Sequence, residues 1–348
     1  MVNLIVAGLG RVGQTLVREV LSTSLRERYR FVGLFEQSGG LVDDKGLPDA
    51  VVLQALECKD HIQDVEGAEK VDSLKVCFQS GVTFPSPCVL LDLTAAEEMA
   101  EVLIMALERG MACVAANKKP LVAPWAVYCR LRHPRFRYET TVGAGLPVIA
   151  TLESLLDSGD EIRAIRGVLS GTLGYIMSQL EEGVPFSQAV RTAYERGYTE
   201  PHPADDLLGM DVARKALILA RTMGLRLELE DVRVEGLCPS EMAARPVEEF
   251  LEELRRLDPV LERRSAEARA RGRVLRYVAE VSPAGCMVGL AEVERESALG
   301  KGRGPDNIIV FETRRYCERP LVIQGPGAGP LVTAGGVLAD VALVSGKP

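Results

Sequence analysis

The sequence predicts an α/β protein of two domains, a doubly wound parallel sheet followed by a domain of the α+β class. Residues 2–7 (VNLIVA) form an unbroken apolar run, which is typical of a strand buried on both faces. A glycine turn follows at once, and further strands then alternate with helices, as in a parallel sheet. At 348 residues the chain is longer than one ordinary core, so two domains are expected.

The first domain is expected over residues 1–142, completed by the C-terminal segment 324–348. Apolar runs bounded by turn residues predict its strands at 2–7, 30–35, 73–78, 87–91, 111–115 and 135–142. Helical periodicity predicts helices at about 14–24 and 95–109. The C-terminal segment begins with a glycine turn and continues as a helix, which we expect to pack back on this domain.

The second domain is expected over residues 143–323. Periodicity predicts helices at 148–157, 173–182, 187–196, 204–223 and 246–270, and strands at 162–171, 273–281, 286–293 and 306–315. The last three strands have no helices between them, so the sheet should be mainly antiparallel. A homodimer formed through this sheet is predicted from apolar residues at alternate positions, namely Val281, Val288, Leu290 and Val293.

The composition argues against a nucleic-acid or membrane partner. Hydrophobic residues make up 47% and charged residues 26%, and acids and bases are interleaved at a net charge of −8. No apolar run has the length of a membrane span, and the first strand leaves no room for a signal peptide, so a cytoplasmic location is expected. The eight cysteines form no C-x-x-C pair and predict buried, reduced thiols rather than a zinc site.

The turn Gly8-Leu9-Gly10-Arg11-Val12-Gly13 predicts a dinucleotide site in a Rossmann-type domain. Its glycines permit a tight turn, close approach of a pyrophosphate and contact between helix and strand, while the helix start faces the phosphates. Glu36, at the end of the second strand, can accept hydrogen bonds from both ribose hydroxyls. An ordinary glycine-rich turn is the alternative interpretation.

The same region predicts a preference for NAD over NADP. A 2′-phosphate beside Glu36 would meet a like charge, and residues 37–44 contain two more acids and no arginine or lysine. Arg11 and Lys45 are the cations that would favour NADP instead.

Residues 197–215 (GYTEPHPADDLLGMDVARK) gather four acids and a lysine, namely Glu200, Asp205, Asp206, Asp211 and Lys215. Pro201 and Pro203 exclude a continuous helix before residue 204, after which apolar residues recur at helical spacing. Asp211 and Lys215 are four apart and therefore share a helix face. The group suits a pocket for a small zwitterion, and a solvated surface pair is the alternative.

Four motifs in order resemble homoserine dehydrogenase: GLGRVG, then Ala116-Asn117-Lys118-Lys119, then ETTVGAGLPVI (139–149), then SGTLGYI (170–176) with the acid–lysine segment. The similarity continues through residues 306–316 to 325–329. The form resembled is the short monofunctional one, without aspartokinase or regulatory domain. The resemblance implies interconversion of L-homoserine and L-aspartate 4-semialdehyde, in the pathway to threonine, methionine and isoleucine.

The resemblance also implies residue roles. Catalysis falls to Lys215 and Lys118, and a lysine ammonium can supply the proton and the charge stabilisation that reduction of an aldehyde needs. The implied substrate residues are Thr172, Tyr198, Glu200, Asp206 and Asp211. Besides the glycine turn and Glu36, the implied cofactor residues are Thr94, Lys118, Gly329 and Thr333. A structural monovalent cation, sodium, is implied at Glu139, Val142, Ala144 and Leu146.

Two positions depart from the family pattern. Leu93 stands where an asparagine is often found, and His202 stands where an aspartate is frequent, on the outside of its loop. Two other functions are alternatives to this one. An acylating semialdehyde dehydrogenase needs a cysteine nucleophile paired with a histidine, and neither Cys88 nor Cys113 lies in such a motif. A cofactor-binding redox sensor would not need the acid–lysine group.

Overall fold

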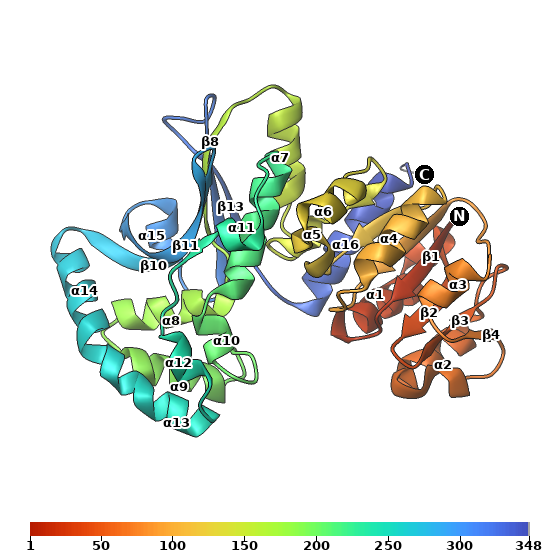
Figure 1. The fold of residues 1–348 in the computed structure, drawn as a ribbon, viewed down its shortest axis with the longest axis horizontal. Helices are drawn as coiled ribbons and strands as arrows, with labels where there is room; N and C mark the ends of the chain where they lie inside the picture. Colours follow the sequence, from red (N-terminus) through yellow and green to blue (C-terminus); the bar gives the residue numbers. More distant parts are fainter. Residues whose placement is uncertain (347–348) are drawn as a thin grey trace. The chain divides into compact units, whose positions relative to one another are not determined.

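The computed structural model describes residues 1–346 and consists of two compact units (Figure 1). One contains Met1–Gly145 together with the segment from Ala328 onward, and the other contains Leu146–Gly327. No helix within residues 1–346 is both long and apolar enough to cross a membrane.

The first unit is built on a seven-stranded sheet with the order β4-β3-β2-β1-β5-β6-β7. Five strands run parallel: β1 (Val2–Ala7), β2 (Tyr29–Glu36), β5 (Cys88–Asp92), β6 (Ala112–Ala115) and β7 (Phe136–Arg137). Two antiparallel strands extend one edge: β3 (Gly39–Val42) and β4 (Glu69–Val71). From β1 the chain pairs first with β2 on one side and later with β5 on the other. The point between β1 and β5 is therefore where a parallel sheet of this kind binds ligands, beyond the carboxyl ends of its strands.

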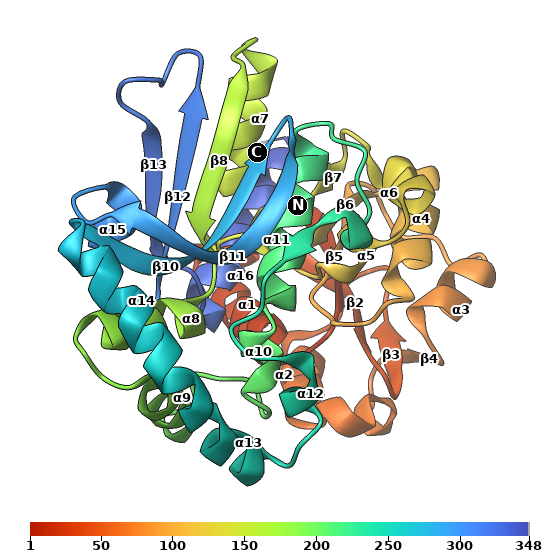
Figure 2. The same ribbon diagram turned by 60° about the vertical axis from the view of Figure 1, so that its left-hand side comes forward.

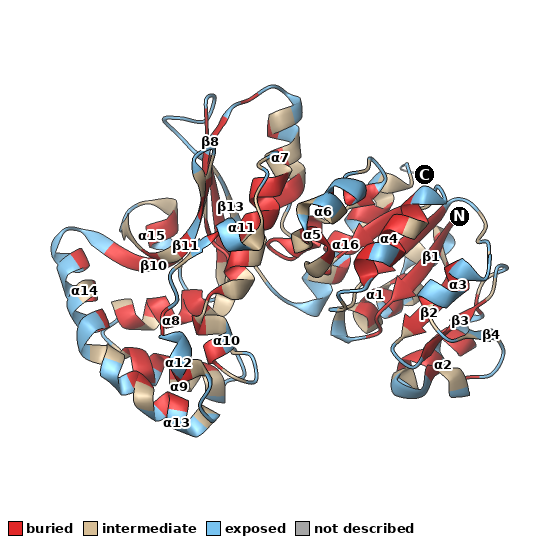
Figure 3. Ribbon diagram, viewed as in Figure 1, coloured by how far each residue is buried: buried red, intermediate tan, exposed pale blue. Residues whose placement is uncertain are grey.

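Helices cover this sheet, and many residues of these helices and of the strands are buried (Figure 3). The helices are α1 (Arg11–Ser22), α2 (Asp49–Glu57), α3 (Leu74–Gln79), α4 (Met99–Glu108), α5 (Lys119–Val122), α6 (Trp125–Leu131) and α16 (Pro330–Val344). The prediction that the C-terminal helix packs on the first domain is confirmed, because Ala334, Val337 and Val341 of α16 share one core with Leu16 and Val20 of α1. Short 3-10 turns lie at Ser24–Glu27, Lys59–Asp64 and Glu139–Thr141.

One predicted strand of this unit is wrong, and another is shorter than predicted. Residues 73–78 begin a helix, because the Ser73 hydroxyl accepts a hydrogen bond from the Val76 amide (3.2 Å) and caps α3. The apolar residues Leu74, Cys77 and Phe78 then lie on one buried helix face. The strand predicted at 135–142 is short, since β7 ends at Arg137 and a 3-10 turn follows.

The second unit is built on a six-stranded sheet with the order β13-β12-β8-β10-β11-β9. The strands are β8 (Ile162–Val168), β9 (Arg233–Val234), β10 (Arg273–Ser282), β11 (Gly285–Glu294), β12 (Asp306–Thr313) and β13 (Leu321–Pro326). All neighbours pair antiparallel except β9 and β11, which confirms a mainly antiparallel sheet. β13 was not expected and occupies the start of the predicted glycine turn.

Helices of the second unit pack largely on one face of its sheet (Figure 2). They are α7 (Val148–Asp157), α8 (Gly171–Glu181), α9 (Phe186–Glu195), α10 (Ala204–Leu207), α11 (Met210–Thr222), α12 (Ser240–Ala243), α13 (Val247–Glu253), α14 (Asp258–Ala270) and α15 (Ala298–Lys301), with 3-10 turns at Leu229–Asp231 and Leu254–Leu257. The helix predicted over 204–223 is broken at Gly209, which has φ 75°. The helix predicted over 246–270 breaks before Pro259, whose ring cannot continue the preceding turn.

The other face of this sheet carries an apolar hollow of about 610 Å³. Its apolar lining includes Val278, Ala291, Val293, Val310 and Val322. Arg166 spans the same region and pairs with Glu280 (3.0 Å) and Glu312 (3.2 Å).

The residues named for the dimer prediction do not all lie on that face. Side chains alternate along a strand, and Val281 is an odd number of positions from Val278, so it points to the opposite face, where it is fully buried. Val288 pairs with Ala279 and Leu290 pairs with Tyr277, so both also belong to the opposite face. Of the four predicted residues, Val293 lines the hollow.

Candidate functional site

The turn between β1 and α1 is tightly packed at Gly8 and Gly13 and open to solvent space at Gly10. Gly8 has φ 95°, and a Cβ there would lie 2.8 Å from the Leu93 carbonyl oxygen. A Cβ at Gly13 would collide with the Gly8 carbonyl, which accounts for the third glycine. Gly10, by contrast, has open space around its Cβ position, and α1 begins there with no side-chain cap and no acid in its first turn. The free amides and open space fit an anion such as a pyrophosphate.

Glu36 lies beside this turn, because its carboxylate accepts a hydrogen bond from the Leu9 amide. Lys45 lies at the opposite end of β2, where its carbonyl accepts a hydrogen bond from Arg30 (2.8 Å). The cation closer to Glu36 is Lys59, whose pKa is raised mainly by its hydrogen bond to Asp60, with a smaller effect from Glu36. The sequence did not point to Lys59, because β3 and α2 separate it from Glu36 along the chain. Arg11 is exposed at the start of α1.

Thr94 follows β5 and belongs to a buried polar network. The Asp92 carboxylate accepts hydrogen bonds from the Thr94 amide (3.1 Å), the Thr94 hydroxyl (2.7 Å) and the Asn117 side-chain amide (3.0 Å). Asn117 also donates to the Ala96 carbonyl (2.8 Å) and so links the loops after β5 and β6. Asp92 and Asn117 were not predicted as site residues. The sequence signal that could have identified Asp92 is an acid at the end of a buried apolar strand, as in residues 90–92 (LLD).

Lys118 follows this network and is the N-cap residue of α5. The adjacent Lys119 forms an ion pair with Glu97 (3.4 Å). Gly329 has φ 129° and is the N-cap residue of α16, where its carbonyl accepts a hydrogen bond from the Thr333 hydroxyl (2.8 Å). Lys118, Gly329 and Thr333 therefore all lie at helix starts of the first unit.

In the second unit, Lys215 is held at two points. Its Nζ lies 2.9 Å from Asp211 Oδ2 and donates a hydrogen bond to the Leu169 carbonyl (2.6 Å). The Lys215 side chain is 12% exposed and the Asp211 side chain 47% exposed. The lysine is therefore directed inward, toward the end of β8, and does not form the solvated surface pair that was the alternative.

Glu200 lies on the loop before α10, and Asp206 lies within α10, the short helix that precedes α11. Asp206 accepts a hydrogen bond from the Glu200 amide (2.8 Å), which folds the loop around the aspartate. Burial raises the pKa of Asp206 above its ordinary value, and the charges of Glu200 and Asp211 add to this effect. The hydrogen bond from the Glu200 amide acts in the opposite direction. The Thr172 hydroxyl donates to the Tyr198 carbonyl (2.6 Å).

Thr172 is thus hydrogen-bonded to Tyr198 and Asp206 to Glu200, while Asp211 acts on Asp206 through its charge. Tyr198 is 49% exposed, and its ring packs edge-on against Tyr175 of α8 at 5.3 Å. His202 lies away from the carboxylates, with its ring against Phe250 (5.2 Å) and Nε2 at 2.9 Å from the Arg245 carbonyl.

The predicted cation positions fall on both sides of the division between the units. Glu139 is buried, and its amide donates a hydrogen bond to Asp340 (2.8 Å). Ala144 has φ 54° and is the one non-glycine residue with positive φ between residues 1 and 346. Val142 is buried, and the Leu146 carbonyl accepts a hydrogen bond from the Val148 amide (2.8 Å). In the same described range, histidine, cysteine and carboxylate side chains form no cluster of three suited to a metal ion.

The cysteines do not suit an acylating mechanism. Cys88 and Cys113 are buried, and burial raises the pKa of Cys88 to about 12 and that of Cys113 still further. Both thiols are therefore protonated and poor nucleophiles. All eight cysteines are free, but Cys129 and Cys317 are exposed, which corrects the expectation that the thiols are buried.

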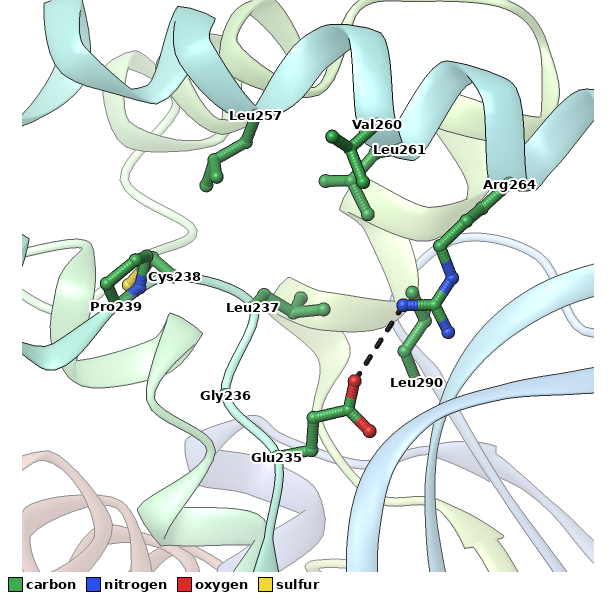
Figure 4. A pocket seen from close by; sticks show the side chains of 10 residues that line it. All are labelled: Glu235, Gly236, Leu237, Cys238, Pro239, Leu257, Val260, Leu261, Arg264 and Leu290. Carbon is green, nitrogen blue, oxygen red and sulfur yellow. Dashed lines mark ion pairs between the residues drawn. The ribbon is translucent and has the colours of Figure 1, made fainter.

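A cavity of about 320 Å³ lies between α14 and the segment 235–239 (Figure 4). It is lined mainly by aliphatic side chains, and Arg264 pairs with Glu235 across it (3.7 Å). None of the predicted site residues lines it.

Known proteins resemble this chain over most of its length. A family model described as homoserine dehydrogenase matches residues 147–342, and one described as the NAD-binding domain of homoserine dehydrogenase matches residues 8–134. The bifunctional aspartokinase/homoserine dehydrogenase of Haemophilus influenzae is 37% identical over 357 residues, which cover 98% of this chain and 42% of that protein. The chain thus spans less than half of that relative's length.

Solved structures agree with the fold. A putative homoserine dehydrogenase from Archaeoglobus fulgidus has a TM-score of 0.78 at 25% identity and covers 98% of each chain. A Candida auris protein of unknown function has a TM-score of 0.87 at 30% identity, covering 98% of this chain and 97% of its own. The α/β fold class and its Rossmann-type sheet are confirmed.

Proposed function

This chain belongs to the homoserine dehydrogenase family, and from that premise we propose that it interconverts L-homoserine and L-aspartate 4-semialdehyde with a nicotinamide dinucleotide. The observation that carries the proposal is the inward-directed Lys215 ammonium, held by Asp211 and the Leu169 carbonyl next to two further acids. When bound, the dinucleotide supplies or removes the hydride.

Lys215 moves the proton at the substrate oxygen. In reduction of the aldehyde its ammonium donates to the oxygen on which negative charge develops, and in oxidation of the alcohol its amine accepts the hydroxyl proton. The Asp211 carboxylate at 2.9 Å stabilises the ammonium and sets the direction of the side chain. The family resemblance assigns the second catalytic lysine to Lys118, the N-cap residue of α5.

The carboxylates of Glu200 and Asp206 bind the ammonium group of the substrate. Glu200 is exposed and Asp206 half-buried, so one carboxylate meets the substrate in water and the other in a drier environment. Tyr198 lies on the same loop, and the Thr172 hydroxyl of α8 donates a hydrogen bond to its carbonyl, which holds the loop against that helix.

The glycine turn would hold the pyrophosphate through the start of α1, and Glu36 would hold the ribose. The open space at Gly10 and the uncapped helix start support this assignment. We further propose that NAD is preferred, because the Glu36 carboxylate would repel a 2′-phosphate and Lys45 lies at the far end of β2. Lys59 and exposed Arg11 are the cations that act against this preference.

A structural cation and a second copy of the chain complete the proposal. A sodium ion would be held mainly by backbone oxygens of Glu139, Val142, Ala144 and Leu146. The left-handed conformation of Ala144 supports this site, since such strain usually has a functional cause. A second copy of the chain covers the apolar hollow on the sheet of the second unit. Its lining combines aliphatic side chains with the ion pairs of Arg166 and with the charged residues Arg273, Glu292 and Glu294.

The test is absorbance at 340 nm with L-homoserine and either oxidised cofactor, followed from neutral to alkaline pH. We expect cofactor reduction that requires homoserine, and D-homoserine provides the control for non-specific reduction. No signal with L-homoserine in either cofactor would contradict the proposal.

A further inference from the structure

Asp92 is a buried carboxylate without a cationic partner. The residue is 0% exposed, and within residues 1–346 it forms no ion pair. Its three side-chain hydrogen bonds come from neutral donors, namely the Thr94 amide, the Thr94 hydroxyl and the Asn117 amide. A buried charge is costly unless it is paired, so one compensated only by neutral donors needs an explanation.

The donors show which form of Asp92 the site accommodates. Both carboxylate oxygens accept hydrogen bonds, which suits the ionised group. Burial raises the pKa of Asp92 to about 6, although the hydrogen bonds from Thr94 and Asn117 lower it. At pH 8 the group therefore carries its negative charge inside the protein.

The position of Asp92 relates this charge to the ligand. Asp92 is the last residue of β5 and pairs with Ala7 of β1, the residue before the glycine turn. The Leu93 carbonyl and the Thr94 amide that follow it lie against Gly8. Asp92 thus stands at the point between β1 and β5 where doubly wound sheets bind dinucleotides.

We propose that Asp92 provides a fixed negative charge that stabilises the oxidised, cationic nicotinamide relative to the neutral reduced ring. The inference rests on the proposed function, because it requires a nicotinamide dinucleotide at this edge of the sheet. The physical cause is Coulombic attraction across a region of low dielectric constant, which acts on one redox form of the ring and leaves the other unaffected. Asp92 then determines which redox form of the cofactor binds more tightly, in addition to holding Thr94 and Asn117.

The experiment measures dissociation constants of the oxidised and the reduced cofactor by titration calorimetry at pH 8, without substrate. In Asp92→Asn we expect the ratio of oxidised to reduced dissociation constants to rise at least about threefold, the size expected for loss of one nearby charge in a partly screened site. Thr94→Val removes the three hydrogen bonds of the Thr94 hydroxyl, with Asp92, Ala96 and Asn117, and retains the charge, so it should weaken both forms alike. Glu98→Gln removes an exposed charge of the same loop and should leave the ratio unchanged.

Equal weakening of both forms in Asp92→Asn would show that Asp92 is only structural and would overturn the inference. If Asp92→Asn does not fold, the same ratio of dissociation constants is measured for the wild-type protein at several pH values. Protonation of Asp92 should raise the same ratio between pH 8 and pH 5.5, and a flat ratio would overturn the inference. The titratable neighbours that act on Asp92 are Glu98 on its own loop and the protonated Cys113 thiol on β6. A wild-type protein that binds neither form would instead contradict the proposed function.

Discussion

Lys215 and Asp211 form an ion pair of 2.9 Å one helical turn apart on α11, and the lysine is by far the less exposed partner. The same ammonium donates a hydrogen bond to the Leu169 carbonyl at the end of β8 (2.6 Å). Two acceptors on different elements fix the direction of a side chain that is otherwise flexible. A lysine held in this way is suited to deliver a proton to one defined position.

Replacement of Lys215 by methionine should lower kcat at least about a hundredfold, the range for loss of a general acid or base. Cofactor binding should change little, because Lys215 belongs to the second unit and the glycine turn to the first. Steady-state kinetics and cofactor titration measure the two quantities. Lys301→Met, at a lysine that is 63% exposed, is the matched control. Near wild-type turnover in Lys215→Met would refute the assignment.

Replacement of Asp206 by asparagine should weaken substrate binding and stabilise the fold. The KM for homoserine should rise about tenfold or more, the cost of one charge-assisted hydrogen bond. The pKa of Asp206 is raised in the folded state, so its ionisation disfavours folding once the pH exceeds the ordinary carboxyl range. The variant should therefore gain Tm at pH 8 and lose that gain as the pH falls toward 4.

Asp205→Asn is the control for this prediction, because Asp205 is the exposed neighbour. Thermal unfolding at several pH values, together with KM, checks both effects. A Tm gain of equal size at every pH would exclude titration of Asp206 as its cause.

The cofactor preference should depend on Glu36. We expect a higher kcat/KM with NAD than with NADP, and Glu36→Gln should raise the value for NADP by about tenfold, since one like charge is removed. Asp44→Asn, an exposed acid of the following loop, should have little effect. A tenfold or greater preference of the wild type for NADP would show that Arg11 or Lys59 outweighs Glu36.

The protein should be a homodimer that dissociates when the sheet face of the second unit is charged. Val322→Glu introduces a carboxylate at a residue that is 40% exposed and lines the apolar hollow, so it should give monomers in light scattering. Val260→Glu, at a residue of α14 that is 48% exposed, should leave the dimer intact. A monomeric wild type at micromolar concentration would contradict the prediction.

Sodium should stabilise the fold more than a large organic cation does. We expect a higher Tm in sodium chloride than in choline chloride at equal ionic strength, because only the small ion fits between backbone oxygens. Ala144→Gly would relieve the left-handed backbone strain and serves to separate strain from ion binding. Identical Tm values in the two salts would count against the cation.

Local patterns were enough to predict the parallel sheet, the glycine turn and the antiparallel sheet. An apolar run such as residues 2–7 and a glycine at each tight position, as at Gly8 and Gly13, reflect constraints that act within a few residues of the chain. The spacing of Asp211 and Lys215 likewise determined that the two side chains share a helix face.

Long-range packing decided the remainder. Only the fold shows that Lys215 turns inward to Leu169, because this contact joins residues on different elements. Residues 73–78 are apolar enough for a strand, yet the cap at Ser73 and the buried face of Leu74 and Phe78 select a helix. Asp92 resembled the ordinary end of a strand until β1, β5 and β6 placed its carboxylate between Thr94 and Asn117. Whether a side chain is buried, and which groups it bonds to, depends on elements far apart in the chain. Local periodicity carries no information about these contacts.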